Sequence, residues 1–423
     1  MQTEISSEHT IILAKRRHIE ELERLIICTE FVELIGEMIH QIQAERGASC
    51  LYLASGGQRF AKERADIVAG NAPLDMRFKQ GLQRHLDANP QADAKQLTLV
   101  SWILLGFDQL TVLRHQVTLQ QISFIDCIQA FTRLIGSLVS LIFEITDTTV
   151  NSKISSSLLA LYNLVQGKEF AGQERAVGAH MFGSGNVQIE HQQKVMELMA
   201  LQERHFESFN QFATPALRNI WVRTSMTDTQ RKFLQYQSKL TSASPGQTLQ
   251  PKDGDCWFEL CSQRLTDFWQ IQCLLISDMH QALKLLLQEA QQDLKNTRQH
   301  LQQLRDKAKV PGRDSAFFNL SIPVEHSYGF LTDKANQPYP IESVISLLQQ
   351  QSQQIAEMES ELSETKKALT ERKQIERAKG LLMSTFGLTE VEAYQSMRST
   401  AMEQKRKIID VAENILFQHK QAS

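Results

Sequence analysis

The amino-acid sequence predicts an all-α protein. Nine prolines and nineteen glycines are few for 423 residues, and they gather in clusters between long stretches rich in Leu, Gln, Glu, Ala and Lys, which favour helices. Within these stretches apolar side chains recur at the spacing of one helix face, as at Leu99, Trp102, Ile103, Phe107 and Leu110. We expect two tandem four-helix bundles, a long coiled-coil helix and a small three-helix carboxy-terminal domain.

The composition is that of a globular protein with room for two or three cores, since 42% of the residues are hydrophobic and 22% are charged. The first ten residues are polar, and Gly, Ser and Glu residues interrupt the most apolar stretch, which begins at Leu134. We therefore expect no signal peptide, no membrane span and a cytoplasmic location. The six cysteines form no CxxC pair, which indicates reduced core residues and no metal site.

The breaks in helical spacing divide the chain into four parts. Residues 1–303 have the size of a two-bundle domain, and residues 304–340 form a linker that is rich in proline and has no helical period. A long helix follows at 341–370, and residues 371–423 form the small terminal domain.

The predicted helix at 341–370 carries a seven-residue repeat. One seam is apolar and the second is mostly polar, so the helix is expected to pair as a weak coiled coil. The alternative is a single helix that rests on the first domain. The apolar seam consists of Ile341, Leu348, Ile355, Leu362 and Leu369.

An internal duplication marks the first domain. ERGASCLYLASG at Glu45–Gly56 aligns without gaps on ERAVGAHMFGSG at Glu174–Gly185, 129 positions further on. Each segment opens with Glu-Arg, closes with Ser-Gly and carries small residues between. An offset of this size suits two related bundles in tandem.

Arg46 and Arg175 occupy the same position in the two copies. Their small neighbours let another helix approach closely, which would bury the guanidinium groups. A buried guanidinium needs an anionic partner, and its planar fork of donors suits a planar oxyanion such as a carboxylate or nitrate. The alternative is that each arginine bridges to Glu45, Glu174 or an acid of a neighbouring helix.

The segments QAERGASCLYLASGG, RADI at Arg64–Ile67 and GQERAVGAHMF resemble the NIT family of nitrate- and nitrite-sensing domains. This resemblance implies two helical bundles, nitrate or nitrite as effector, and no cofactor. It also implies that arginines of both halves hold the anion, here Arg46, Arg175 and Arg231. Ala65 stands before Asp66 where the family often has Thr, so we expect Arg64 to bridge the bundle or face solvent.

The terminal domain is predicted from three amphipathic helices. Ile375, Ala378, Leu382 and Phe386 share one helix face, and Gly387 suits the position after its carboxyl end. Thr389 and Glu392 form a capping box for a second helix. A third helix buries Ile408, Val411, Ala412 and Ile415.

Basic side chains from all three of these helices can converge on phosphate groups. They are Lys379, Arg398, Lys405, Arg406 and Lys407. The alternative is an ordinary solvated face.

AKGLLM, Glu392-Ala393-Tyr394, Met397-Arg398, Ala401 and RKIIDVA resemble the ANTAR family of RNA-binding domains over residues 371–417. The resemblance implies binding of leader mRNA hairpins, which prevents a terminator from forming. The residues that it assigns to RNA are Lys379, Gly380, Met383, Tyr394, Arg398, Ala401, Lys405, Arg406 and Lys407. Lys405 is assigned on charge alone, because Asn is common at its position in the family.

Together the two resemblances imply a nitrate- or nitrite-responsive transcription antiterminator that forms a homodimer through the coiled coil or the sensor. No phosphate-binding loop, HExxH motif or nucleophile elbow occurs, so we expect no enzyme. The other alternative is a helical scaffold whose terminal domain binds a protein partner.

Overall fold

The protein is described here from a computed structural model. The described residues are 6–90, 92–147, 152–244, 246–250, 252–307, 371, 374–383, 385–388, 390–404 and 406–422. Within them every regular element is an α-helix, so the all-α prediction is confirmed. The predicted coiled coil at 341–370 lies outside the described residues, as does most of the predicted linker.

Four helices form the first half of the molecule: α1 (Ser7–Ala54), α2 (Ala61–Ala88), α3 (Ala94–Thr118) and α4 (Phe124–Asp147). Side chains cap three of them, since Ser6 Oγ accepts a hydrogen bond from the His9 amide, Asp93 from the Gln96 amide and Ser123 Oγ from the Asp126 amide. In this half α1 packs against α2 and α4, and α3 packs against α4.

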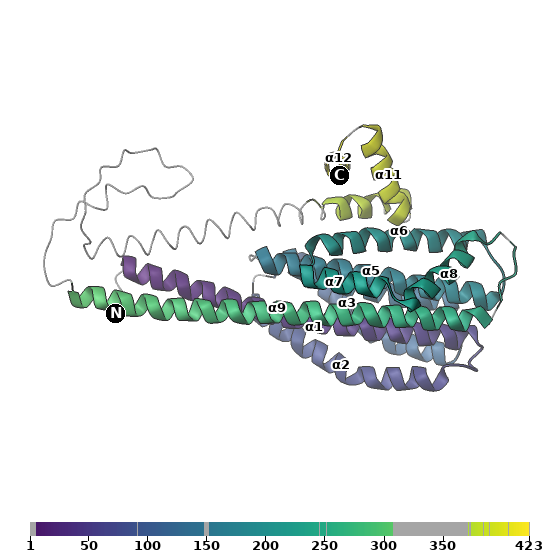
Figure 1. Cartoon of the computed structure of the whole chain (residues 1–423), viewed down its shortest axis with the longest axis horizontal. Helices are drawn as coiled ribbons and strands as arrows, with labels where there is room; N and C mark the ends of the chain where they lie inside the picture. Colours follow the sequence, from purple (N-terminus) through teal and green to yellow (C-terminus); the bar gives the residue numbers. More distant parts are fainter. Residues whose placement is uncertain are drawn as a thin grey trace.

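The second half contains α5 (Ser152–Ser184), α6 (Ile189–Phe212), α7 (Pro215–Ser225), α8 (Asp228–Ser242) and α9 (Lys252–Lys307). Here α5 packs against α6 and α9, and α8 packs against α9. Figure 1 shows α9 running along α1, which contacts it directly. Helix α9 continues past residue 303, where the sequence placed the start of the linker.

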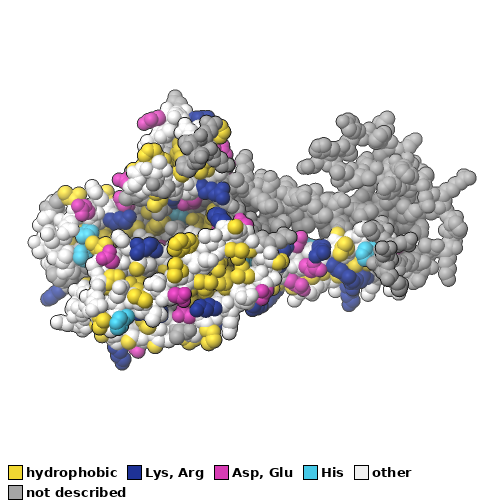
Figure 2. All heavy atoms as spheres, turned by 180° about the vertical axis from the view of Figure 1, so that it is seen from behind, with side chains coloured by type: hydrophobic (Ala, Val, Ile, Leu, Met, Phe, Trp, Pro, Cys, Tyr) yellow, Lys and Arg dark blue, Asp and Glu magenta, His cyan; other side chains and the backbone are white. Residues whose placement is uncertain are grey.

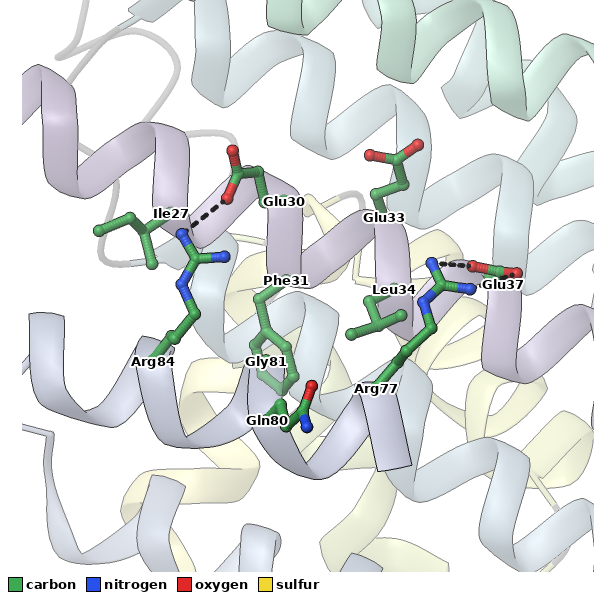
Figure 3. A pocket seen from close by; sticks show the side chains of 10 residues that line it. All are labelled: Ile27, Glu30, Phe31, Glu33, Leu34, Glu37, Arg77, Gln80, Gly81 and Arg84. Atoms are coloured by element: carbon green, nitrogen blue, oxygen red, sulfur yellow. Dashed lines mark hydrogen bonds and ion pairs between the residues drawn. The ribbon is translucent and has the colours of Figure 1, made fainter. Parts of the chain in front are cut away.

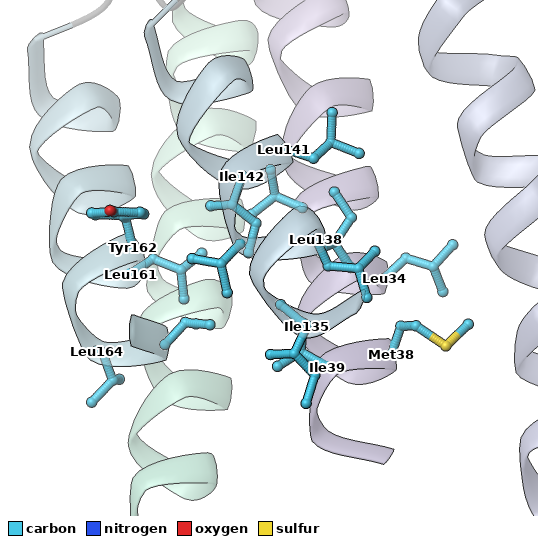
Figure 4. Close-up of a cluster of buried hydrophobic side chains, with 14 of the residues drawn as sticks. Leu34, Met38, Ile39, Ile135, Leu138, Leu141, Ile142, Leu161, Tyr162 and Leu164 are labelled. Carbon is cyan, nitrogen blue, oxygen red and sulfur yellow. The ribbon is translucent and has the colours of Figure 1, made fainter. Parts of the chain in front are cut away.

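The largest core is shared by the two halves. Residues 158–165 of α5 are all buried, and every one of them except Asn163 is hydrophobic. Figure 4 shows Leu161 of α5 turned toward α4, where Leu138 and Ile135 lie next to Ile39 of α1. The separate cores that composition suggested are therefore joined at α5, and a smaller cluster around Phe182 and Trp257 belongs to the second half alone.

Two helices reach the length and hydropathy of a membrane span, Ala94–Thr118 and Phe124–Ile145. Both contribute to the shared core, as long apolar helices of bundles do. Helix α3 also exposes Trp102, Leu105 and Val112. Figure 2 shows hydrophobic side chains gathered in patches among charged ones on the rear face of the molecule.

The carboxy-terminal domain comprises the helical residues 374–383, α11 (Glu390–Glu403) and α12 (Ile408–Ala422). Gly387 has a φ of +66° after the first helix, as its predicted position requires. Phe386 is 68% exposed, so it does not join the predicted apolar face. The buried part of this helix face therefore ends at Leu382. The core consists of Ala378, Leu382, Ala393, Met397, Ala401, Val411 and Ala412.

Candidate anion-binding and RNA-binding sites

The repeated Glu-Arg pairs lie on α1 and α5, which pack against each other. Each arginine reaches across to the other helix. A Cβ atom on Gly47 of α1 would lie 2.4 Å from Nη2 of Arg175, and a Cβ atom on Gly172 of α5 would lie 2.7 Å from Nη2 of Arg46. Glycine at both positions lets the two guanidinium groups approach the opposite backbone.

Arg46 is buried and paired with an acid of the neighbouring helix. Its Nη1 and Nη2 donate to the two carboxylate oxygens of Glu169 on α5, at 2.5 and 3.0 Å, and Nη1 also donates to Thr132 Oγ1 at 2.9 Å. Glu169 accepts two more hydrogen bonds, from the side-chain amides of Gln43 at 2.8 Å and Gln173 at 2.9 Å. For Arg46, the structure therefore favours the bridging alternative.

Arg175 is also buried, but within the described structure it has no carboxylate partner. Its Nη1 donates to Ser262 Oγ at 3.0 Å and its Nη2 to the Gln43 carbonyl at 3.2 Å, while Nε has no partner among the described residues. Burial, followed by the charge of Arg46, lowers the pKa of Arg175 to about 10. Arg175 is thus a cation at neutral pH whose charge is not balanced by an ion pair.

Glu45 and Glu174, the glutamates of the two Glu-Arg pairs, each contact an arginine of their own half of the molecule. Glu45 accepts hydrogen bonds from Nε and Nη2 of Arg114 on α3, both at 2.8 Å. Glu174 lies 3.7 Å from Nη1 of Arg264 on α9 and accepts a hydrogen bond from the Gln202 amide at 2.7 Å. The two copies therefore make equivalent contacts. Each glutamate binds an arginine of its own half, and each arginine lies at the interface between the halves.

In the carboxy-terminal domain the residues assigned to RNA fall into two groups. Gly380, Met383, Arg398, Arg406 and Lys407 are exposed. Lys379 is buried and paired with Glu376, Tyr394 is half-buried, and Ala401 belongs to the hydrophobic core. Lys405 lies outside the described residues.

Arg204 on α6 contacts the second group. Its Nη2 donates to Glu376 at 3.2 Å, and its guanidinium lies 4.0 Å from the centroid of the Tyr394 ring. Figure 1 shows the carboxy-terminal domain beside α6. Two residues assigned to RNA, Lys379 and Tyr394, thus lie at or next to a contact with the helical body.

A family model described as nitrate and nitrite sensing matches residues 37–280, more than half of the chain. The chain belongs to this family, the NIT family. A model of the ANTAR domain matches residues 363–416. Both resemblances drawn from the sequence motifs are confirmed.

Two known proteins are similar to this NIT protein over almost its whole length. The nitrate regulatory protein of Klebsiella oxytoca is 28% identical over 408 residues, which are 95% of this chain and 93% of that protein. The solved structure of the NasR transcription antiterminator matches with a TM-score of 0.58 and 24% identity, covering 97% of this chain and 98% of the other. The second likeness supports the fold.

Two other arginines of the NIT domain lie away from the Arg46–Arg175 pair. Arg231 is on the exposed surface of α8 and forms an ion pair with Asp228 at 3.1 Å. The structure therefore does not bring it to the group with which the family resemblance placed it. Arg64 is buried and donates to Ser49 Oγ, Thr118 Oγ1 and the Arg114 carbonyl, which is the bridging role expected of it.

Two titratable residues that the sequence did not single out lie near the arginine pair. Lys168 is completely buried, with its Nζ 3.4 Å from Gln272 Oε1 and 4.7 Å from the centroid of the Trp269 ring. Burial lowers the pKa of Lys168 to about 7. His40 stacks on the same indole at 4.4 Å, and burial followed by the charges of Lys168 and Arg175 lowers its pKa to about 3.

A groove of the NIT domain lies elsewhere, between α1 and α2, and has a volume of about 240 Å³ (Figure 3). Its two arginines, Arg77 and Arg84, are paired with Glu37 and Glu30, and Glu33 adds a third carboxylate. Acids outnumber cations there, so an anion is disfavoured. A smaller cavity of about 20 Å³ borders Arg175 along the seam between α1 and α5.

Proposed function

We propose that the protein is a nitrate- or nitrite-responsive transcription antiterminator. The anion binds the NIT domain and frees the ANTAR domain to bind leader RNA hairpins, which keeps a terminator from forming. The presence of both domains in one chain supports this proposal. So do the names of the similar proteins, a nitrate regulatory protein and a transcription antiterminator.

The anion is proposed to bind where Arg46 and Arg175 meet. The observation that carries this assignment is Arg175, a buried guanidinium with an unpartnered Nε and no carboxylate among the described residues. A buried charge without a counter-charge is costly, and a planar monovalent oxyanion matches both the charge and the geometry of the fork. Arg231 is left out of this site, because it is exposed and already paired with Asp228.

The cavity beside Arg175 is too small for nitrate, so anion binding there would require a conformational change. It is lined by Gly47, Cys50, Phe258 and His180 as well as Arg175, and its 20 Å³ suit about one water molecule. Nitrate has four heavy atoms, so its entry requires α1 and α5 to shift. Ligand binding is thereby coupled to the packing of the helix pair that joins the two halves.

Calorimetric titration with nitrate tests the assignment of Arg175. Arg175→Ala should weaken binding at least tenfold, about 1.4 kcal/mol, while Arg231→Ala should leave the affinity unchanged because its side chain is on the surface. Thermal unfolding followed by circular dichroism checks that both variants fold. Equal nitrate affinity in Arg175→Ala and the parent would rule out this site.

The RNA face is proposed to consist of the exposed basic residues Arg398, Arg406 and Lys407 with Gly380 and Met383 beside them. Phosphate contacts from separate helices would position the RNA, and Tyr394 suits stacking on an unpaired loop base. Ala401 packs in the core, so we assign it a supporting role instead of a contact. Lys405 remains a proposed phosphate contact.

The contact made by Arg204 suits a resting state. It holds Tyr394 against α6 and engages Glu376, the partner of Lys379. An RNA loop and α6 would compete for the Tyr394 ring. We therefore propose that the arrangement with Arg204 engaged is the inhibited form and that anion binding disfavours it.

We propose that the protein acts in the cytoplasm, as a regulator of nascent RNA would, and that it forms a homodimer. The exposed apolar side chains on α3 suit a dimer through the sensor as well as one through the predicted coiled coil. The alternative to RNA is a protein partner for the carboxy-terminal domain. Binding to a hairpin RNA that weakens steeply with added salt distinguishes RNA from a protein partner.

A further inference from the structure

Glu169 is an acid built into the centre of the proposed anion site. Only 3% of the residue is exposed. Three side chains hold its carboxylate: Arg46 through both terminal nitrogens, Gln43 and Gln173. With donors on both oxygens, the carboxylate is fixed against the guanidinium of Arg46, which the family resemblance assigned to the anion.

The charges around Glu169 can be counted. Glu45 and Glu174 are engaged with Arg114 and Arg264 of their own halves. At the interface itself the charges that remain are those of Arg46, Arg175 and Glu169.

Two further groups near the interface are close to neutral in mildly alkaline solution. Burial lowers the pKa of Lys168 to about 7 and helps to lower that of His40 to about 3. Above neutral pH the buried group of Arg46, Arg175 and Glu169 therefore carries one uncompensated positive charge, at Arg175.

We propose that Glu169 sets the charge of the ligand: it neutralises Arg46, so that the site balances one monovalent anion and rejects divalent ones. This inference rests on the proposed anion site and adds its specificity. A dianion such as sulfate would leave one negative charge buried without a partner, which is unfavourable in a medium of low dielectric constant. Nitrate and nitrite each bring one charge and leave the group neutral.

We expect Glu169 to control the ratio of sulfate affinity to nitrate affinity. In Glu169→Gln both arginines are uncompensated, so the ratio of sulfate affinity to nitrate affinity should rise at least tenfold. Glu169→Asp keeps the charge and should keep the parental ratio. The matched control is Glu174→Gln, which removes a buried carboxylate of the same helix that faces the other way, and the ratio should again stay at the parental value.

The test is isothermal calorimetry on the full chain at pH 8, with nitrate and with sulfate, at constant ionic strength set by sodium gluconate. Thermal unfolding identifies a variant that fails to fold. For that case the double variant Arg46→Gln/Glu169→Gln removes one charge of each sign, and its preference for nitrate over sulfate should match that of the parent.

The possible outcomes separate the two proposals. Nitrate binding in the parent with an unchanged ratio in Glu169→Gln overturns the role of Glu169 alone and makes it a structural bridge. A parent that binds sulfate better than nitrate also overturns it. A parent that binds neither anion overturns the proposed function together with this inference.

Discussion

Lys168 is a buried amine enclosed by aromatic and amide groups. The Trp269 ring and the Gln272 amide lie against its Nζ. Burial favours the neutral amine, and this is why the pKa of Lys168 falls from its usual 10.5 to about 7. Proton binding at this one residue therefore differs between the folded and unfolded chains over a wide range of pH.

That difference predicts a pH dependence of stability. Between pH 7 and 10.5 the unfolded chain binds more protons at Lys168 than the folded chain, so the free energy of unfolding should rise with pH across this window. Urea unfolding of the parent and of Lys168→Met, measured from pH 6 to 9.5, checks it. The variant should be the more stable protein near pH 6, by a few kcal/mol, since each tenfold change in proton affinity corresponds to about 1.4 kcal/mol. Its advantage should shrink as the pH rises. An advantage that is constant over pH would show that Lys168 does not titrate in this range.

At the scale of residues, the sequence identified buried charged side chains only within the two duplicated segments. The burial of Arg46 and Arg175 could be predicted, because two copies of one segment placed small residues around each arginine. That of Glu169 and Lys168 could not, because they lie among several other polar residues of α5, from Gln166 to Arg175, and neither spacing nor composition shows which of these side chains meets α1. Arg231 is a different case. The family resemblance assigned it to the anion, but in the structure its side chain is exposed to solvent.

At the scale of elements, the proposed anion site depends on how α1 and α5 cross. Both helices are close enough there for each guanidinium to occupy the space beside the other helix's glycine. Helical spacing predicted that these helices exist. It did not predict their shared core, because residues 158–165 of α5 are hydrophobic on nearly every face and so give no preferred direction of packing.

The close approach of α1 and α5 predicts that alanine in place of glycine lowers nitrate affinity at this contact but only stabilises the protein elsewhere. Gly47→Ala and Gly172→Ala place a methyl group 2.4 and 2.7 Å from the nearest guanidinium nitrogen. We expect each to displace that side chain, lower nitrate affinity at least tenfold and offset the roughly 1 kcal/mol gain in helix propensity. Gly136→Ala on α4 is the matched control: nothing lies within 4 Å of its added Cβ, so it should stabilise the protein and leave nitrate binding unchanged. Calorimetry and urea unfolding measure the two effects, and a Gly47→Ala variant that resembles the control would contradict this view of the crossing.

At the scale of the whole molecule, the sensor and the carboxy-terminal domain meet at α6, two helices away from α1. Helix α5 contacts both α1 and α6, so a shift of α5 at the proposed anion site would reach the helix that carries Arg204. To move a switch from about 1:99 to 99:1, the anion must favour the active form by about 5.5 kcal/mol. A contact that contributes part of that amount should be detectable when it is removed.

Arg204→Ala is expected to release the carboxy-terminal domain without nitrate. It removes the ion pair with Glu376 and the cation–π contact with Tyr394, together worth about 1 to 3 kcal/mol, because both are partly buried. Hairpin RNA binding in the absence of nitrate, measured by gel shift, should therefore rise about fivefold or more, while calorimetry should show nitrate binding retained. Arg218→Ala on the exposed face of α7 is the control and should keep the parental dependence on nitrate. If Arg204→Ala depends on nitrate as strongly as the parent does, the contact at α6 does not restrain the RNA-binding domain, and the inhibited form must be held by another surface.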